Sequence, residues 1–105
     1  EAGKKCPYTG ENIPLVSLLD DQIVDIEHIV PYSRCFDDSY MNKTICLASF
    51  NRDVKKNFTP FELFGGDEQK YFELLRRIEN LPFGKRKKFE TKEVKFDEMV
   101  GRQLS

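Results

Sequence analysis

The sequence predicts an α+β fold in which a short two-stranded hairpin leads into a helix, with additional helices around this core. Three observations predict it. Residues 22–30 are rich in β-branched side chains and stop before Pro31, which is typical of a strand. Residues 44–47 form a second short apolar run, which is suited to a returning strand. Residues 48–56 then have the composition of a short helix.

Length and charge bound the function only loosely. A chain of 105 residues is predicted to form one domain, and it contains no long apolar run. We therefore expect no membrane association and a cytoplasmic location. Residues 1–38 hold eight acidic and three basic side chains, a balance of −5, whereas residues 39–105 hold ten and fourteen, a balance of +4. An acidic half that binds metal and a basic half that meets phosphates would have this distribution.

The cysteines indicate a reducing compartment. Cys6, Cys35 and Cys46 are odd in number and form no C-x-x-C pair, so we interpret them as packing residues. The chain also starts without a methionine, and we interpret it as one domain, residues 1–105, excised from a larger protein.

Outside the central hairpin, the first half of the chain gives weaker signals. Residues 1–12 are interpreted as a polar lead-in with a turn at residues 9–10. Pro14 suits the first turn of a short helix that ends at residues 20–21. Residues 32–43 form a polar loop too long for a tight hairpin turn, and such loops are often functional.

The second half is predicted to be helical. Thr59 to Glu62 has the form of a capping box with Pro60 at the first helical position. Asp67 is predicted to cap the longest helix, in which apolar residues recur at helical spacing.

Two further features follow this helix. Pro82 and Gly84 are predicted to break it, and the basic run at residues 85–88 comes next. This run is interpreted either as a solvated face or as a contact to phosphates. A last amphipathic segment is predicted around residues 94–100.

The chemistry centres on His28, the only histidine, which directly follows Glu27. Neighbouring side chains of a strand point to opposite faces, so the two share a site only where the strand ends or bulges, and Pro31 favours that. Asn42 and Asn51 follow in the loop and at the helix. Together these residues predict a site for one hard cation beside one titratable base.

Each of these residues also has a structural interpretation. A single histidine is more often a surface or satisfied core residue, Asn42 suits a turn, and Asn51 suits a helix start. Asp25 is interpreted as a solvated charge, as a partner that orients a metal ligand, or as a ligand itself. The acidic pair at residues 37–38 is interpreted as part of a solvated loop rather than as a metal site.

The motifs at residues 25–31, 37–39, 42–43 and 51–52 resemble those of a known family. Their sequences, D-I-E-H-I-V-P, D-D-S, N-K and N-R, are similar to the HNH nuclease domain of type II CRISPR effectors, the RNA-guided DNA endonucleases. The C-P-Y-T-G sequence at residues 6–10 resembles the entry to this domain in compact members. The resemblance implies a ββα-metal core over about residues 6–56 and a helical accessory part over about residues 57–105.

The resemblance also implies roles. Glu27 and Asn51 would ligate Mg²⁺, for which Mn²⁺ substitutes, and His28 would be the general base. Asn42 would orient the loop and the histidine. The family cuts the DNA strand that pairs with its guide RNA. We therefore expect a guide RNA–target DNA heteroduplex and the RuvC and other domains of the parent effector as partners, and a monomeric protein.

Two departures from the family pattern matter. The family more often has Asp at the position of Glu27, and the hard oxygen ligand is kept in this exchange. The wider superfamily often has a histidine ligand where this chain has Lys55, and a protonated lysine cannot ligate a cation.

Two other functions stay open at this point. A free-standing homing or restriction-type HNH endonuclease would need its own DNA-reading element, and the sequence shows none. A catalytically inactive nucleic-acid-binding module would use the basic second half of the chain and keep only a vestigial site.

Overall fold

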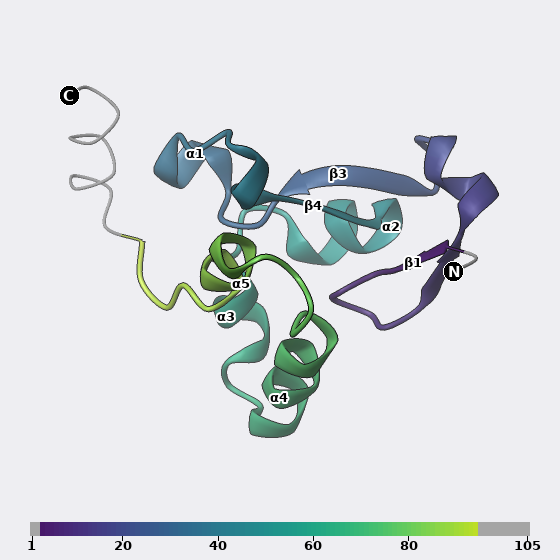
Figure 1. Cartoon of the computed structure of the whole chain (residues 1–105). Coiled ribbons are helices and arrows are strands. Elements are labelled where there is room, and N and C mark those ends of the chain that lie inside the picture. Colours follow the sequence, from purple (N-terminus) through teal and green to yellow (C-terminus); the bar gives the residue numbers. More distant parts are fainter. Residues whose placement is uncertain (1–2, 95–105) are drawn as a thin grey trace.

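The computed structural model describes residues 3–94 of the chain. These residues form two antiparallel hairpins and a set of short helices, which confirms the predicted α+β fold. The elements are β1 (Gly3–Lys5), β2 (Asn12–Pro14), η1 (Leu15–Leu19), β3 (Val24–His28), α1 (Tyr32–Cys35), η2 (Tyr40–Asn42), β4 (Lys43–Leu47), α2 (Ala48–Phe50), η3 (Asn51–Lys55), α3 (Pro60–Phe64), α4 (Glu68–Arg77) and α5 (Phe83–Phe89). In Figure 1 the β3–β4 hairpin crosses the top of the molecule, with α2 beneath it and α5, α3 and α4 further down.

The β3–β4 hairpin carries the predicted site residues at one end. β3 pairs antiparallel with β4 so that His28 lies opposite Lys43 at the end of the ladder. The predicted strand at residues 22–30 is confirmed in place but is shorter than expected. The first residues of the predicted strand form a turn instead. The N–H groups of Ile23 and Val24 both donate to the carbonyl of Asp20 in this turn. β3 ends at His28, and Glu27 and His28 are both still paired with residues of β4.

The predicted helix at residues 48–56 is confirmed, although its second half is not α-helical. α2 passes directly into η3, a π-helix in which the N–H of Lys56 bonds to the carbonyl of Asn51 at 2.9 Å. This bond spans five residues where an α-helix spans four, so the turn is wider. A π-helix of five residues is too short to produce a recognisable periodic pattern, so the sequence did not indicate it.

The polar lead-in at residues 1–12 contains strands that were not predicted, and the predicted turn at Gly10 is confirmed. β1 and β2 form a second hairpin in which Lys4 lies opposite Ile13. Gly10 has a φ of 79° and its N–H bonds to the carbonyl of Cys6 at 2.9 Å, so a left-handed residue is needed there. Three-residue strands are too short to produce an alternating pattern, which is why the sequence did not indicate them.

The loop at residues 32–43 contains two short helices that were not predicted, α1 and η2. α1 ends at Phe36 in the left-handed conformation, with a φ of 55°. Both elements have fewer than five residues, and elements of this length depend on tertiary contacts for stability.

The predicted helix starts in the second half are confirmed. The Thr59 hydroxyl accepts the N–H of Glu62 at 3.1 Å, and the Glu62 carboxylate accepts the N–H of Thr59 at 2.8 Å, which completes the capping box of α3. The Asp67 carboxylate accepts the N–H of Lys70 at 3.1 Å at the start of α4.

The predicted break at Pro82 and Gly84 is wrong for the glycine. Pro82 directly precedes α5, whereas Gly84 lies inside it. A Cβ at Gly84 would lie 2.9 Å from Cγ of Met41, so glycine permits α5 to approach η2 closely. The basic run at residues 85–88 therefore belongs to a helix. The predicted segment at residues 94–100 lies outside the described residues, apart from Val94.

The core lies between the two hairpins and α4 and α5. Its buried residues are apolar: Cys6, Tyr8, Ile13, Val24, Ile29, Cys46, Leu74, Ile78 and Phe89. All three cysteines are buried and free, which confirms their interpretation as packing residues. The Tyr8 ring stacks on Phe50 at a centroid distance of 5.4 Å, so the loop of the β1–β2 hairpin packs against α2. Among the described helices, none has the length and apolar character that crossing a bilayer requires.

Candidate active site

The end of β3 opens onto a pocket of about 290 Å³. Its lining comes from β3, α1, η3 and the turn after η3: Ile26, Glu27, His28, Pro31, Tyr32, Ser33, Asn51, Lys56 and Asn57. Glu27, His28 and Asn51, which the sequence predicted to share a site, are all in this set. Asp25 and Asn42 are not.

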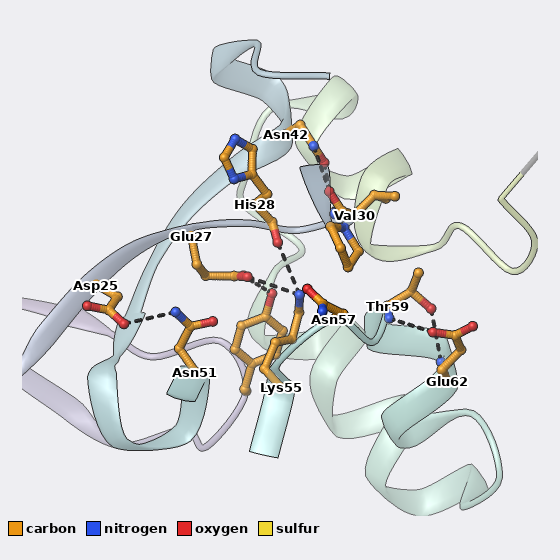
Figure 2. Close-up of polar contacts among 12 residues, drawn as sticks. Asp25, Glu27, His28, Val30, Asn42, Asn51, Lys55, Asn57, Thr59 and Glu62 are labelled. Atoms are coloured by element: carbon orange, nitrogen blue, oxygen red, sulfur yellow. Dashed lines mark hydrogen bonds and ion pairs between the residues drawn. The ribbon is translucent and has the colours of Figure 1, made fainter. Parts of the chain in front are cut away.

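Glu27 is the buried acid of the site, with 6% of its surface exposed. Tyr8 donates its hydroxyl hydrogen to Oε1, and the Lys55 ammonium lies 3.0 Å from Oε2 (Figure 2). Burial raises the pKa of the Glu27 carboxyl, and the contacts with Lys55 and Tyr8 oppose that rise. Lys55 also donates to the backbone carbonyl of His28 at 3.1 Å, so a single ammonium joins both central residues.

His28 is held from the opposite side by Asp38. The Nε2 atom of His28 lies 2.7 Å from Oδ1 of Asp38, and Lys43 lies 3.0 Å from the same oxygen. The hydrogen bond from His28 and that from Lys43 lower the pKa of the Asp38 carboxyl, so it is ionised at neutral pH and accepts only. In neutral His28 this contact favours the tautomer that carries its proton on Nε2 and its lone pair on Nδ1.

Asn51 is oriented by Asp25. The Asn51 amide nitrogen donates to Oδ2 of Asp25 at 2.8 Å, and Arg52 donates to both oxygens of the same carboxylate. Burial raises the pKa of Asp25, and the hydrogen bonds from Arg52 and Asn51 outweigh that and lower it. With its nitrogen fixed on Asp25, the amide turns its oxygen toward the Glu27 side of the site (Figure 2). Asp25 is thus placed as an orienting partner of Asn51.

Asn42 is completely buried and does not reach the pocket. Its Oδ1 accepts the N–H of Val30 at 2.9 Å, and its Nδ2 donates to the carbonyls of Val30 and Asp37 at 2.9 and 2.8 Å. Asn42 therefore fixes the backbone just before the 31–41 loop, at Val30, and inside it, at Asp37, next to the residue that contacts His28.

Three contact residues were missed by the sequence interpretation. Tyr8 and Glu27 are 19 residues apart, and no spacing rule relates them. Lys55 was considered only as a missing ligand, and Asp38 as part of a solvated loop and of the D-D-S motif, without a contact to His28. In each case the contact arises from packing between separate elements, and the one local signal was the acidic pair in the loop after His28.

The chain matches a known family over most of the site. The sequence profile of the HNH endonuclease family covers residues 6–61, which is more than half of the chain. This match includes both predicted strands of the central hairpin and the helix that carries Asn51.

Individual proteins are similar in sequence to this chain over most of its length. The chain is 46% identical over 83 residues to the CRISPR-associated endonuclease Cas9 of Campylobacter jejuni, covering 79% of this chain and 8% of the relative. It is 36% identical over 91 residues to Cas9 of Staphylococcus aureus, covering 84% of this chain and again 8% of the relative. The chain thus spans less than a tenth of the length of these curated relatives.

Solved structures of such proteins also have a similar fold. A crystal structure of Streptococcus thermophilus Cas9 in complex with the AGAA PAM superimposes with a TM-score of 0.76 at 26% identity, covering 89% of this chain and 10% of that one. A second structure of that protein, in complex with the AGGA PAM, gives 0.73 at the same identity, over 95% and 10%. The chain therefore belongs to the HNH endonuclease family, and it is similar in sequence and fold to the HNH nuclease domain of the CRISPR effector Cas9.

Proposed function

We propose that this chain is the catalytic domain that hydrolyses the DNA strand paired with a guide RNA, in a larger effector that also contains a RuvC nuclease domain. The observation that supports it best is the arrangement around His28. Asp38 contacts its Nε2, which leaves Nδ1 as the nitrogen that can take a proton, and Glu27 and Asn51 line the same pocket. This is the arrangement that a hydrolase with one general base requires.

In this proposal His28 removes the proton from the attacking water at Nδ1. The Asp38 carboxylate holds the imidazole in the matching tautomer and stabilises the positive charge that the ring gains. Lys43 keeps Asp38 in place from the neighbouring strand. Asn42 acts one step further away, because it fixes the loop that carries Asp38.

The donor set suits Mg²⁺, with Mn²⁺ as its substitute. The Asn51 amide oxygen accepts no hydrogen bond from the described residues, and the Glu27 carboxylate supplies the hard charge that this ion prefers. Each carboxylate oxygen has two lone pairs, so the contacts with Tyr8 and Lys55 leave Glu27 with acceptor capacity. When bound, the ion draws charge off the scissile phosphate and stabilises the leaving 3′ oxygen.

The partners in this proposal are a guide RNA–target DNA heteroduplex and the other domains of the effector. In such effectors base pairing selects the sequence, and the nuclease domain needs only contacts to the strand backbone. The near-neutral net charge of −1 agrees with a domain that receives its substrate from its neighbours.

The test is His28→Ala in the effector that carries this chain, assembled with its guide RNA and given Mg²⁺. We expect cutting of the guide-paired strand to fall by about 10²–10⁴-fold, because a general base contributes that much. Binding of the target should stay unchanged. Wild-type cutting of that strand by the variant would remove His28 from the mechanism. Failure of the wild-type effector to cut it would favour an inactive binding module, and equal cutting by the isolated chain would favour a free-standing endonuclease.

A further inference from the structure

The turn at the end of η3 holds a lysine in a backbone conformation that favours glycine. Lys56 has a φ of 43° and a ψ of −124°, and the N–H of Phe58 bonds to the carbonyl of Lys55 at 2.9 Å. These values are those of the first central residue of a type II′ turn, a position that Gly dominates. A side chain there costs free energy, and such outliers gather at functional sites.

The π-helix before this turn places Lys56 on the pocket. In an α-helix, residues five apart lie about 140° apart around the axis, so Asn51 and Lys56 would face different sides. In η3 the N–H of Lys56 bonds instead to the carbonyl of Asn51, which brings the two about one turn apart. Both residues line the pocket, together with Glu27 and His28.

Lys56 is also the cation of the site that has no carboxylate partner. The other cations around the site are each paired with an acid: Arg52 with Asp25, Lys55 with Glu27, Lys43 with Asp38, Lys88 with Asp37 and Arg34 with Glu62. Lys56 makes no ion pair with any residue that the structure describes, and it is exposed. Among the pocket-lining residues it is the only lysine or arginine.

We propose that Lys56 binds a phosphate of the substrate strand in this pocket, with its ammonium group as the donor. The strained turn holds Lys56 in the lining of the pocket that Glu27, His28 and Asn51 also line. The Glu27 charge is already offset by Lys55, so the ammonium of Lys56 is available to a negatively charged ligand. This inference rests on the proposed function and adds a substrate-binding residue to it.

The test compares three substitutions of Lys56 in the assembled effector, by single-turnover cutting of the guide-paired strand in Mg²⁺. Lys56→Gln removes the charge and keeps the strained backbone, and Lys56→Gly removes the charge and relieves the strain. Both should slow cutting by about 10- to 100-fold, the size of one charge-assisted hydrogen bond. Lys56→Arg should stay within about threefold of wild type, because the charge is kept. Lys70→Gln, on the exposed start of α4, is the matched control and should cut at the wild-type rate.

Thermal unfolding of the chain separates binding from a structural role. Lys56→Gly should melt no lower than wild type, because glycine suits the positive φ. Slow cutting by this variant with undiminished stability is the expected signature. Wild-type cutting by Lys56→Gly or Lys56→Gln would overturn the proposal and leave the His28 mechanism standing. If the wild-type effector does not cut the paired strand, the proposed function fails and the role of Lys56 fails with it.

Discussion

The ammonium of Lys55 lies 3.0 Å from Oε2 of Glu27, and both side chains are almost fully withdrawn from solvent, at 0% and 5% exposure. Lys55 therefore provides a built-in positive charge for the acid that is proposed to bind Mg²⁺ (Figure 2). This charge allows a carboxylate to be buried at the end of β3. It also means that a bound cation must share Glu27 with an ammonium group.

Lys55→Met should destabilise the chain by roughly 3–5 kcal/mol, because it leaves the buried Glu27 carboxylate without its charge partner. The additional change Glu27→Gln should recover most of this loss, since the isosteric amide carries no charge. Denaturant unfolding at pH 7 measures both free energies, with Lys70→Met on exposed α4 as the control. Equal stability of Lys55→Met and wild type would show that the pair contributes nothing.

Glu27→Asp should retain cutting of the paired strand in the effector within about tenfold, because both carboxylate oxygens are kept. Glu27→Gln should lose at least about 100-fold, since the charge stabilisation by a metal ion is worth several kcal/mol. The shorter aspartate should also melt lower, because it moves away from Tyr8 and Lys55. Full activity of Glu27→Gln would argue against Glu27 as a ligand.

Asp38→Asn should reduce cutting by about tenfold, a loss typical of a group that orients a reacting residue rather than reacting itself. The amide cannot impose the same tautomer on His28, so the pH dependence of the cutting rate should shift as well. The thermal midpoint should not change, because Asp38 is exposed. A rate and pH profile identical to wild type would remove Asp38 from the site.

Asn42→Ala should cost about 2–4 kcal/mol of unfolding free energy. The change leaves the buried N–H of Val30 and the carbonyls of Val30 and Asp37 without the hydrogen bonds that Asn42 makes to them. Chemical denaturation at pH 7 measures this loss. Asn42→Asp is the more discriminating variant, because it keeps one acceptor and loses both donor bonds, so it should also be destabilised. Wild-type stability of both variants would show that the hydrogen bonds of Asn42 to Val30 and Asp37 do not stabilise the fold.

Asp37 should make the chain sensitive to acid. Burial raises the pKa of its carboxyl, but the contacts with Lys88 and Ser39 outweigh this and bring the pKa to about 2. Because this pKa is lower in the folded chain, the ionised Asp37 stabilises the fold at pH values above the ordinary pKa of 3.8. This stabilisation, about 2 kcal/mol of unfolding free energy, is lost as the pH falls toward 2. The raised pKa of Glu27 has the opposite effect, because its contribution to the unfolding free energy decreases as the pH rises. Unfolding of wild type and Asp37→Asn at pH 7 and pH 2 isolates the first effect, because the variant should lose less stability on acidification.

The sequence by itself determined the local elements that depend on short-range chemistry. The β-branched run with its proline fixed β3, and Thr59 and Glu62 fixed the start of α3, because a capping box is complete within four residues. It also gave the pairing of Glu27 with His28 at a strand end, and Asn51 on the following helix. Those three residues line one pocket, as the motif spacing predicted.

Only the tertiary structure decided which side chains contact these three. Tyr8 reaches Glu27 from another hairpin, and Lys55 reaches it because the π-helix widens the turn after Asn51. Asp38 reaches His28 because Asn42 holds the backbone of the loop between them. Contacts of this kind depend on the packing of elements that are distant in sequence and on one extra residue in a helical turn. Neither produces a periodic pattern that the sequence would reveal.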